Sequence, residues 1–477
     1  NYSTRIALER EAYNRLTAVR EMKSQQIEDY FQSIRNQVRT FSEDRMIVDA
    51  MRTFSGSFQS LPGELVARPD DYRDLDTSLR TYYESEFLPR LSVNLKSSPE
   101  LKEYWPQTRA SHLLQYLYIS NNPNATGDKH LLDAASDYTS YAAAHREYHP
   151  IIRSYLETFG YYDIFLVDVE TGNIVYSVFK EVDYATSLLT GPYKNTNFSR
   201  AFRAARDAGE NNFVSIVDFD HYAPSYNDQA SFIASPIFDG DEQIGVLVFQ
   251  MPVSRINDIM TNNQGWADVG LGQTGETYIV ASDFTLRNQS RFLIEDKDNY
   301  LQMLTDIGTP AGVIEDIINL GTSIGHQRAE TVGSIAALKG YTGTQVFPDY
   351  RGVNVLSSYS PLRLEGLHWA IMSEIDEEEA FQHIRALRNR MFMLAAALVA
   401  LVVLLSYALS RSLTQPIRLL GQAAESLTSG TLDQAVTRDS GDEIGDLAEN
   451  FEKMRLALQR SFSEIQHKND ELEQRVQ

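Results

Sequence analysis

Hydrophobic residues follow a helical period in the first part of the chain. Between position 8 and about position 54 the sequence lacks glycine and proline, and its apolar residues recur every three or four positions. This spacing places them on one face of a helix. We therefore predict one long amphipathic helix over residues 1–60. Residues 61–150 contain prolines at intervals and a cluster of turn-forming residues from Asn121 to Gly127, which is typical of short helices joined by loops.

The hydrophobic period changes to two after residue 150. Segments 163–169 and 173–180 flank a Glu-Thr-Gly turn, which is a hairpin signature. Alternating segments continue at 213–219, 231–238 and 244–252, and a similar series lies at 276–282, 285–292, 345–348, 353–361 and 367–374. The pattern predicts an α+β fold with two lobes that each contain a sheet, over residues 151–262 and 263–376.

An uncharged stretch of 20 residues, 391–410, follows the second lobe. As a helix it is long enough to cross about 30 Å of hydrocarbon, and globular helices rarely stay apolar on every face. We predict a membrane-spanning helix here, within a helical segment over 377–412. The arginines on the two sides of this segment do not fix its orientation.

Two amphipathic segments follow the membrane span. Gly430 suits the end of the first segment, and Asp442 and Glu443 suit the exposed N–H groups at the start of the second. Two such helices cannot bury their apolar stripes alone, so we predict a parallel homodimer that forms a four-helix bundle over 413–460 and a coiled coil over 461–477. The residues expected at the dimer axis are Ile417, Leu420, Leu427, Ile444, Leu447, Phe451, Met454 and Leu458.

Motifs in both halves of the chain resemble known receptor domains. Pro416-Ile417, Gly430 and Asp442-Glu443-Ile444-Gly445 resemble the HAMP domain of bacterial transmembrane receptors. The two lobes behind a long helix resemble double Cache sensors, with segments 162–168 and 272–278 and the Asp239-Gly240 turn carrying the resemblance. These resemblances imply PAS-like lobes outside the cell, a HAMP domain in the cytoplasm and anchoring in the inner membrane. Such receptors have another membrane helix before the long one, so the start at Asn1 suggests a fragment.

Two residues near the bundle are expected to affect signalling without contacting ligand. Pro416 lacks the N–H group that would continue the membrane helix without a break. The carboxylate of Glu443 stabilises the start of the second bundle helix. Both therefore become candidate signalling residues.

Composition and motifs narrow the function further. The net charge of −22 without a basic cluster argues against nucleic acid as the partner, and the lack of cysteine excludes disulfides and thiolate metal sites. Gly270, Gly272 and Gly275 fit a dinucleotide motif but precede a strand, which is the opposite order. His145 and His149 could share a metal ion, but no third ligand is evident, and we interpret them as helix-end residues. We predict no enzyme activity, cofactor or metal in this chain.

The loop after the third strand of the first lobe mixes carboxylates with aromatic residues, which suits small-molecule recognition. Two carboxylates beside three tyrosines favour a cationic or polyhydroxylated ligand, whereas Lys180 could neutralise a carboxylate or bind an anionic group. The R-x-W-Y run of amino-acid-binding Cache sensors is absent, and a solvated acidic loop is the alternative interpretation. The predicted ligand-binding residues are Tyr176, Lys180, Asp218, Asp220, Tyr222, Tyr226 and Ser235.

The combined hypothesis is the sensing and signal-transducing portion of a bacterial receptor. An extracellular small molecule would bias a two-state helix arrangement inside the cell. The output domain would lie beyond Gln477 and be a nucleotide cyclase, a histidine kinase or a diguanylate cyclase. The alternatives are a methyl-accepting chemoreceptor and a ligand-free ectodomain used for dimerisation or protein docking.

Overall fold

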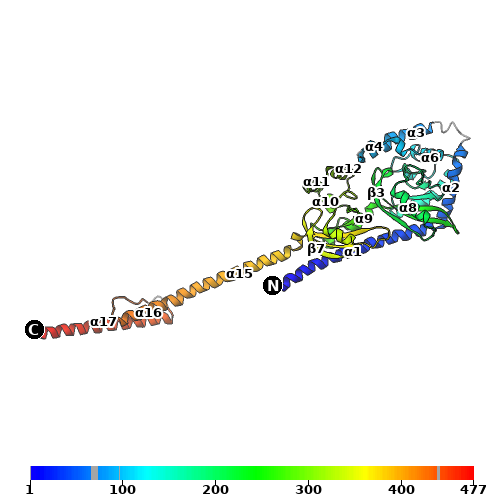
Figure 1. The fold of residues 1–477 in the computed structure, drawn as a ribbon. Helices are drawn as coiled ribbons and strands as arrows, with labels where there is room; N and C mark the ends of the chain where they lie inside the picture. Colours follow the sequence, from blue (N-terminus) through cyan, green and yellow to red (C-terminus); the bar gives the residue numbers. More distant parts are fainter. Residues whose placement is uncertain (1, 66–73, 96, 438–440, 477) are drawn as a thin grey trace. The chain divides into compact units, whose positions relative to one another are not determined.

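The computed structural model describes residues 2–65, 74–95, 97–437 and 441–476. It contains two compact units, Asn1–Gln382 and His383–Gln477. Figure 1 shows that the first unit holds both sheets and the N-terminal helices, whereas the second is entirely helical. The α+β class predicted from the sequence is confirmed.

The N-terminal segment forms two helices, α1 (Tyr2–Ser42) and α2 (Arg45–Leu65). The predicted single helix over 1–60 is therefore wrong in this respect. The chain breaks at Asp44, whose carboxylate accepts a hydrogen bond from the backbone N–H of Met46 at 2.8 Å. An aspartate with this bond favours a new helix start over continuation of the old helix. Helix α1 runs beside both sheets (Figure 1), and its buried residues Ile27, Phe31, Ile34 and Val38 keep the predicted spacing.

A group of short helices covers the first lobe, as the punctuation of residues 61–150 predicts. They are α3 (Leu75–Tyr82), η2 (Tyr83–Phe87), α4 (Leu88–Asn94), α5 (Leu101–Tyr104), α6 (Arg109–Gln115), η3 (Tyr116–Ser120) and η4 (Lys129–Leu131). We call these helices and their loops the cap. The cap leads into the longer helix α7 (Ser140–Phe159).

His145 and His149 lie inside α7 and are fully buried, so the interpretation as helix-end residues is wrong. The Nδ1 atom of His145 is 2.6 Å from the carbonyl oxygen of Asp133. The Nδ1 atom of His149 is 2.7 Å from the Tyr176 hydroxyl. Both rings therefore belong to the core, and no cluster of three metal-ligating side chains occurs in the described part of the chain.

The first lobe is built on a five-stranded antiparallel sheet in the order β2-β1-β5-β4-β3. All five predicted strands are present: β1 (Asp163–Asp168), β2 (Ile174–Ser177), β3 (Ser215–Tyr222), β4 (Asp228–Asp239) and β5 (Glu242–Gln250). Apolar side chains on one face pack with α1, α2 and α7. The other face packs with α8 (Asn197–Asp207) and with α3, η2 and α4 of the cap. The short turn η5 (Ala223–Ser225) joins β3 to β4.

The second lobe has a four-stranded antiparallel sheet in the order β6-β9-β8-β7. Its strands are β6 (Glu276–Ala281), β7 (Gly343–Pro348), β8 (Asn354–Pro361) and β9 (Trp369–Asp376). The helices of this lobe are α9 (Val253–Thr261), η6 (Trp266–Val269), α10 (Arg291–Glu295), α11 (Lys297–Asp306), α12 (Ala311–Leu320), α13 (Val332–Leu338) and α14 (Glu377–Ala380).

The strand predicted over 285–292 is wrong. This segment makes only isolated bridges at Leu286 and Thr285, and α10 begins within it. The side chain of Asn288 accepts a hydrogen bond from the backbone N–H of Ile279 in β6 at 2.8 Å. A side-chain amide thus takes a position on the sheet edge that a strand backbone would otherwise occupy.

The glycines of the G-x-G-x-x-G sequence form the turn that enters β6, which agrees with their predicted place before a strand. Gly270 and Gly272 have φ values of +84° and +60°, which favour glycine. The carboxylate of Glu379 in α14 accepts hydrogen bonds from the backbone N–H groups of Gln273 and Thr274 at 2.9 and 2.8 Å. A Cβ atom at Gly272 would collide with this carboxylate. The turn therefore holds the end of the second lobe by direct contact.

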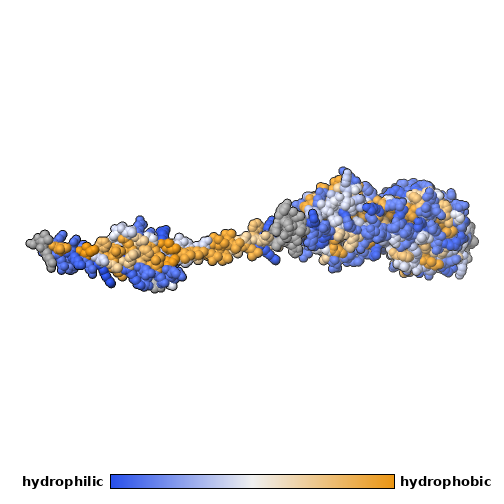
Figure 2. All heavy atoms as spheres, turned by 90° about the horizontal axis from the view of Figure 1, so that it is seen from below, coloured by the Kyte–Doolittle hydropathy of each residue, from blue (hydrophilic) through white to orange (hydrophobic). Residues whose placement is uncertain are grey.

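The second unit consists of α15 (Gln382–Leu409), η7 (Ser410–Thr414), α16 (Gln415–Thr428) and α17 (Glu443–Val476). Within the described residues, one helical segment, Arg388–Thr428, is long and apolar enough to cross a membrane, and it contains the predicted span. Figure 2 shows hydrophobic surface along α15, whose apolar side chains are exposed.

Helix α16 ends and helix α17 begins at the residues that the sequence predicts. Gly430 follows α16 with φ of +80°, and the Asp442 carboxylate accepts hydrogen bonds from the N–H groups of Ile444 and Gly445 at 3.1 and 3.2 Å. Pro416 lies in the first turn of α16, and Glu443 is the first residue of α17. The Arg455 guanidinium donates to the Leu432 carbonyl oxygen at 2.5 Å and so fixes the connector to α17.

Candidate functional site

A small cavity lies in the first lobe between the cap, the segment after β2 and the β3–β4 turn. Its volume is about 100 Å³. We call it the first cavity. Its lining contains three cationic residues, one carboxylate and several aromatic rings: Tyr82, Phe87, Arg90, Thr126, Gly127, Lys129, Tyr162, Phe179, Lys180, Glu181, Val182, Pro224 and Tyr226.

Lys180 is buried and is held by aromatic rings. Its Nζ atom lies 4.6, 5.1 and 5.8 Å from the ring centres of Tyr176, Tyr184 and Tyr118, and it donates a hydrogen bond to the Ser177 carbonyl oxygen. Ring faces attract an ammonium group. Burial nevertheless lowers the pKa of Lys180, and the carboxylate of Asp163 opposes this shift. Burial thus disfavours the charged form of this amine, whereas the ring faces and Asp163 favour it.

Two carboxyl groups follow Lys180 along the chain. Glu181 accepts hydrogen bonds from the Tyr162 hydroxyl at 2.8 Å and the Ser225 hydroxyl at 3.0 Å. Asp183 accepts a hydrogen bond from the Tyr222 hydroxyl at 2.5 Å. Burial raises the pKa of both carboxyl groups, because a charged form loses its hydration there.

Some buried polar atoms beside these carboxyls lack partners. Among the described residues, the second carboxyl oxygen of Asp183 and the hydroxyl of Tyr193 accept or donate no hydrogen bond. Both side chains are almost fully buried. A buried polar group without a partner is costly. These two atoms therefore carry an unfavourable desolvation free energy inside the first lobe.

The cap is tied to the segment that carries these groups. The Gln115 side chain of α6 donates hydrogen bonds to the carbonyl oxygens of Val182 and Tyr184 at 2.9 and 2.8 Å. The Tyr83 hydroxyl of η2 donates to Gln115 at 2.9 Å. These bonds hold the cap against the 180–184 segment.

The structure brings four of the predicted ligand-binding residues to this region. Lys180 and Tyr226 line the first cavity, Tyr176 lies against the Lys180 ammonium group, and Tyr222 bonds Asp183. The Tyr226 ring also lies 5.9 Å from the Arg90 guanidinium. The strand predicted over 173–180 ends at Ser177, and Lys180 has a positive φ of +61°, so the turn after β2 and not strand alternation brings Lys180 to Tyr176.

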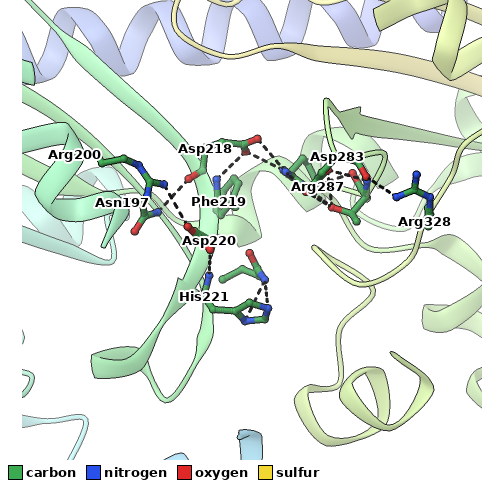
Figure 3. Close-up of polar contacts among 11 residues, drawn as sticks. Asn197, Arg200, Asp218, Phe219, Asp220, His221, Asp283, Arg287 and Arg328 are labelled. Atoms are coloured by element: carbon green, nitrogen blue, oxygen red, sulfur yellow. Dashed lines mark hydrogen bonds and ion pairs between the residues drawn. The ribbon is translucent and has the colours of Figure 1, made fainter. Parts of the chain in front are cut away.

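The other three predicted residues lie elsewhere. Figure 3 shows Asp218 turned toward Arg287 of the second lobe, which it contacts through two hydrogen bonds of 2.9 Å. Asp220 is exposed and pairs with Arg200 at 3.3 Å. Ser235 is buried against α1, where its hydroxyl is 3.0 Å from that of Ser42. The pairing of Asp218 with Asp220 is absent because the β3–β4 register shifts between Val217 and Asp220.

Sequence reasoning missed several residues of the first cavity. Arg90 and Lys129 come from the cap, about 50 to 90 positions before Lys180, and no local pattern joins them to the sheet. Glu181 and Asp183 did carry a signal, because the charged run Lys-Glu-Val-Asp directly follows an apolar strand. Charges at the end of a buried strand are candidates for a site.

Comparison with known proteins gives two family matches. The family model of the Cache domain, dCache_1, matches residues 6–384. The model of the HAMP domain matches residues 408–460. These ranges agree with the two resemblances seen in the sequence.

Similar individual proteins include receptors of pseudomonads. The methyl-accepting chemotaxis protein PctB of Pseudomonas aeruginosa is 24% identical over 271 residues, which is 55% of this chain and 36% of PctB. The solved ligand-binding domain of PctB with L-Arg is 16% identical, covers 50% of this chain and 82% of its own, and gives a TM-score of 0.29. The ligand-binding domain of Pseudomonas fluorescens chemoreceptor CtaA with L-alanine is 10% identical in sequence. The match covers 64% of this chain and 95% of the CtaA domain, with a TM-score of 0.29.

Proposed function

The chain belongs to the Cache domain family, and we propose that it senses an extracellular small molecule and passes the signal across the inner membrane to the cytoplasm. The observation that carries this proposal is the order of its parts: a Cache sensor, a helix of membrane-spanning length and a HAMP domain. A sensor and a transducer joined by one helix can communicate through movement of that helix.

The ligand is proposed to bind in the first cavity. Arg90, Lys129 and Lys180 supply positive charge, and Glu181 supplies an acceptor. This arrangement suits a small molecule that carries an anionic group at one end and a hydrogen-bond donor at the other. The volume of about 100 Å³ restricts it to a small metabolite. Tyr176, Tyr222 and Tyr226 support the charged groups, whereas Asp218, Asp220 and Ser235 are proposed to act outside this cavity.

A ligand screen tests the proposal. The full chain in detergent is heated with a panel of L-amino acids and three- to five-carbon carboxylates. A compound that binds the native state at about 100 times its Kd stabilises it by about 2.7 kcal/mol, which raises the melting temperature. Arg90→Gln and Lys129→Gln should each remove most of this rise.

Arg200→Gln is the matched control, because Arg200 pairs with Asp220 at the surface and does not line the cavity. If no compound raises the melting temperature, the alternative of a ligand-free dimerisation or docking ectodomain gains support. A rise that survives both cavity substitutions would place the ligand elsewhere.

The HAMP domain is proposed to act as a parallel homodimer. In a single chain the side chains of Ile417, Leu447, Met454 and Leu458 are exposed by 57, 47, 46 and 37%. A second copy would bury these apolar residues in a four-helix bundle. Pro416 and Glu443 lie at the starts of α16 and α17, where they would bias the bundle between two arrangements.

Crosslinking between subunits tests the homodimer, since the chain has no cysteine. In membranes, Leu447→Cys and Met454→Cys should give oxidised dimers, because both positions face the proposed axis. Glu449→Cys, on another side of α17, should give few. Equal yields at all three positions would contradict the parallel bundle.

The output domain is proposed to follow the coiled coil over 461–477. A nucleotide cyclase, a histidine kinase, a diguanylate cyclase and a methyl-accepting chemoreceptor domain are all compatible with a sensor followed by HAMP. PctB is a methyl-accepting chemotaxis protein, but the alignment covers only 36% of its length. The chemoreceptor alternative is therefore kept beside the enzyme-linked ones.

A further inference from the structure

A second, larger cavity lies beside the first at the base of the first lobe. Its volume is about 410 Å³, and it shares Tyr162 and Phe179 with the first cavity. The end of α7, the end of β5 and the start of α9 contribute most of its remaining walls. The proposed function assigns no role to it.

The lining of this second cavity has the opposite charge from the first. It contains the carboxylates of Glu157 and Asp228 but no lysine or arginine, whereas three cationic residues line the first cavity. Arg153 forms an ion pair with Glu157 at 3.8 Å from outside the lining, which leaves Asp228 as the carboxylate of the lining without a paired cation among the lining residues. Charge in this lining therefore favours a cation.

The C-terminal end of α7 adds further negative potential to the second cavity. The helix is 20 residues long and ends at Gly160, which has φ of +72° and lines the cavity. The carbonyl end of a helix carries partial negative charge, which stabilises nearby cations. The helix end and the two carboxylates thus both favour the binding of a cation in this cavity.

A buried acceptor in the lining lacks a partner. Gln250 is 3% exposed, and its Nε2 donates to the Ser225 hydroxyl at 3.2 Å. Its Oε1 atom accepts no hydrogen bond from the described residues. An unpaired buried amide oxygen is costly, and a ligand N–H group or an alkylammonium group would compensate it.

From these features we propose that the second cavity binds a small organic cation, such as an amine or a quaternary ammonium compound. Asp228, Glu157 and Gln250 all line the cavity and would face its charged group, and Tyr161 and Tyr162 contribute aromatic rings to the same lining. The apolar part packs on Met251 and Val253.

Occupancy of this site is coupled to the N-terminal helix. The hydroxyl of Tyr161 donates a hydrogen bond to the Gln37 side chain of α1 at 2.5 Å. A ligand that moves the Tyr161 ring therefore acts on α1 without passing through the first cavity.

Calorimetric titration of the full chain tests the proposal in nanodiscs of phosphatidylglycerol, which lack choline headgroups. The probes are choline and butylamine, and their neutral counterparts are 3,3-dimethylbutan-1-ol and butan-1-ol. At least one cation should bind, and its counterpart should bind at least tenfold more weakly. Asp228→Asn keeps the side-chain shape and should raise the Kd of the cation about tenfold, as expected for loss of a charged contact. Glu157→Gln should act in the same direction.

Two control variants separate this site from the rest of the lobe. Glu210→Gln removes a charge from an exposed residue outside the lining and should leave the Kd unchanged. Arg90→Gln alters only the first cavity and should also leave it unchanged. The proposal is wrong if neither cation binds, if the neutral counterparts bind equally, or if Arg90→Gln alone abolishes binding.

Discussion

Replacing Arg287 by methionine is expected to lower the free energy of unfolding of the first unit, Asn1–Gln382, by about 2 to 3 kcal/mol. We call this unit the sensor unit. The Arg287 side chain is 4% exposed and joins Asp218 of β3 to Asp283 of the second lobe, at 2.9 and 3.0 Å. Removing one partner of a buried ion pair typically costs about 3 to 5 kcal/mol. The expected value is smaller because the Asp218 and Asp283 side chains are 31 and 53% exposed, and water screens them.

Tryptophan fluorescence during denaturation of the full chain provides the measurement, because all three tryptophans lie in the sensor unit. Arg200→Met is the matched control: its pair with Asp220 is exposed on both sides, and its loss should change stability very little. Comparable losses in the two variants would show that the Asp218–Arg287 contact does not hold the lobes together.

The sensor unit is also expected to lose stability as the pH rises from about 5 to about 8. Glu276 and Glu374 are opposite each other on β6 and β9 and are buried. Burial raises their pKa values to about 7 and about 8. In the unfolded chain a glutamate has a pKa of about 4.3. Between these values the folded state holds protons that the unfolded state has released, so stability is full at low pH and falls with rising pH.

Glu374→Gln should make this fall shallower by about 2 kcal/mol between about pH 6 and pH 8. The neutral amide cannot ionise, and it can still bond the Tyr278 hydroxyl, which lies 2.9 Å from Glu374. Some fall should remain, because burial also raises the pKa of Asp183 in the first lobe. Glu315→Gln on α12, an exposed position, should leave the pH profile unchanged. An unchanged profile for Glu374→Gln would mean that its carboxyl stays ionised in the fold.

The periodicity of the sequence was sufficient for most of the fold. The alternating segments gave every strand of the first sheet, and the apolar run gave the membrane helix. The failures came from single side chains that replace backbone bonds. Asp44 caps a new helix within an unbroken helical pattern, and Asn288 bonds the edge of β6 where a strand was expected. The spacing of hydrophobic residues carries no information about hydrogen bonds made by single polar side chains.

The candidate site was less accessible to sequence reasoning. Composition placed carboxylates and tyrosines in one loop, but the register shift before Asp220 sends Asp218 toward the second lobe. Arg90 and Lys129 reach the first cavity from the cap, and only the tertiary fold brings them there. Lys180 was predicted from strand alternation with Tyr176, but β2 ends at Ser177, and the turn after the strand brings the ammonium group to the Tyr176 ring.

The contact between Glu379 and the turn at Gly272 has a mechanical consequence. The carboxylate takes two backbone N–H groups and the Thr274 hydroxyl, the last at 2.6 Å, just before the chain leaves the sensor unit. These three hydrogen bonds fix α14 to the turn that precedes β6. A movement of this turn would therefore act directly on α14, the last helix of the first unit before its end at Gln382.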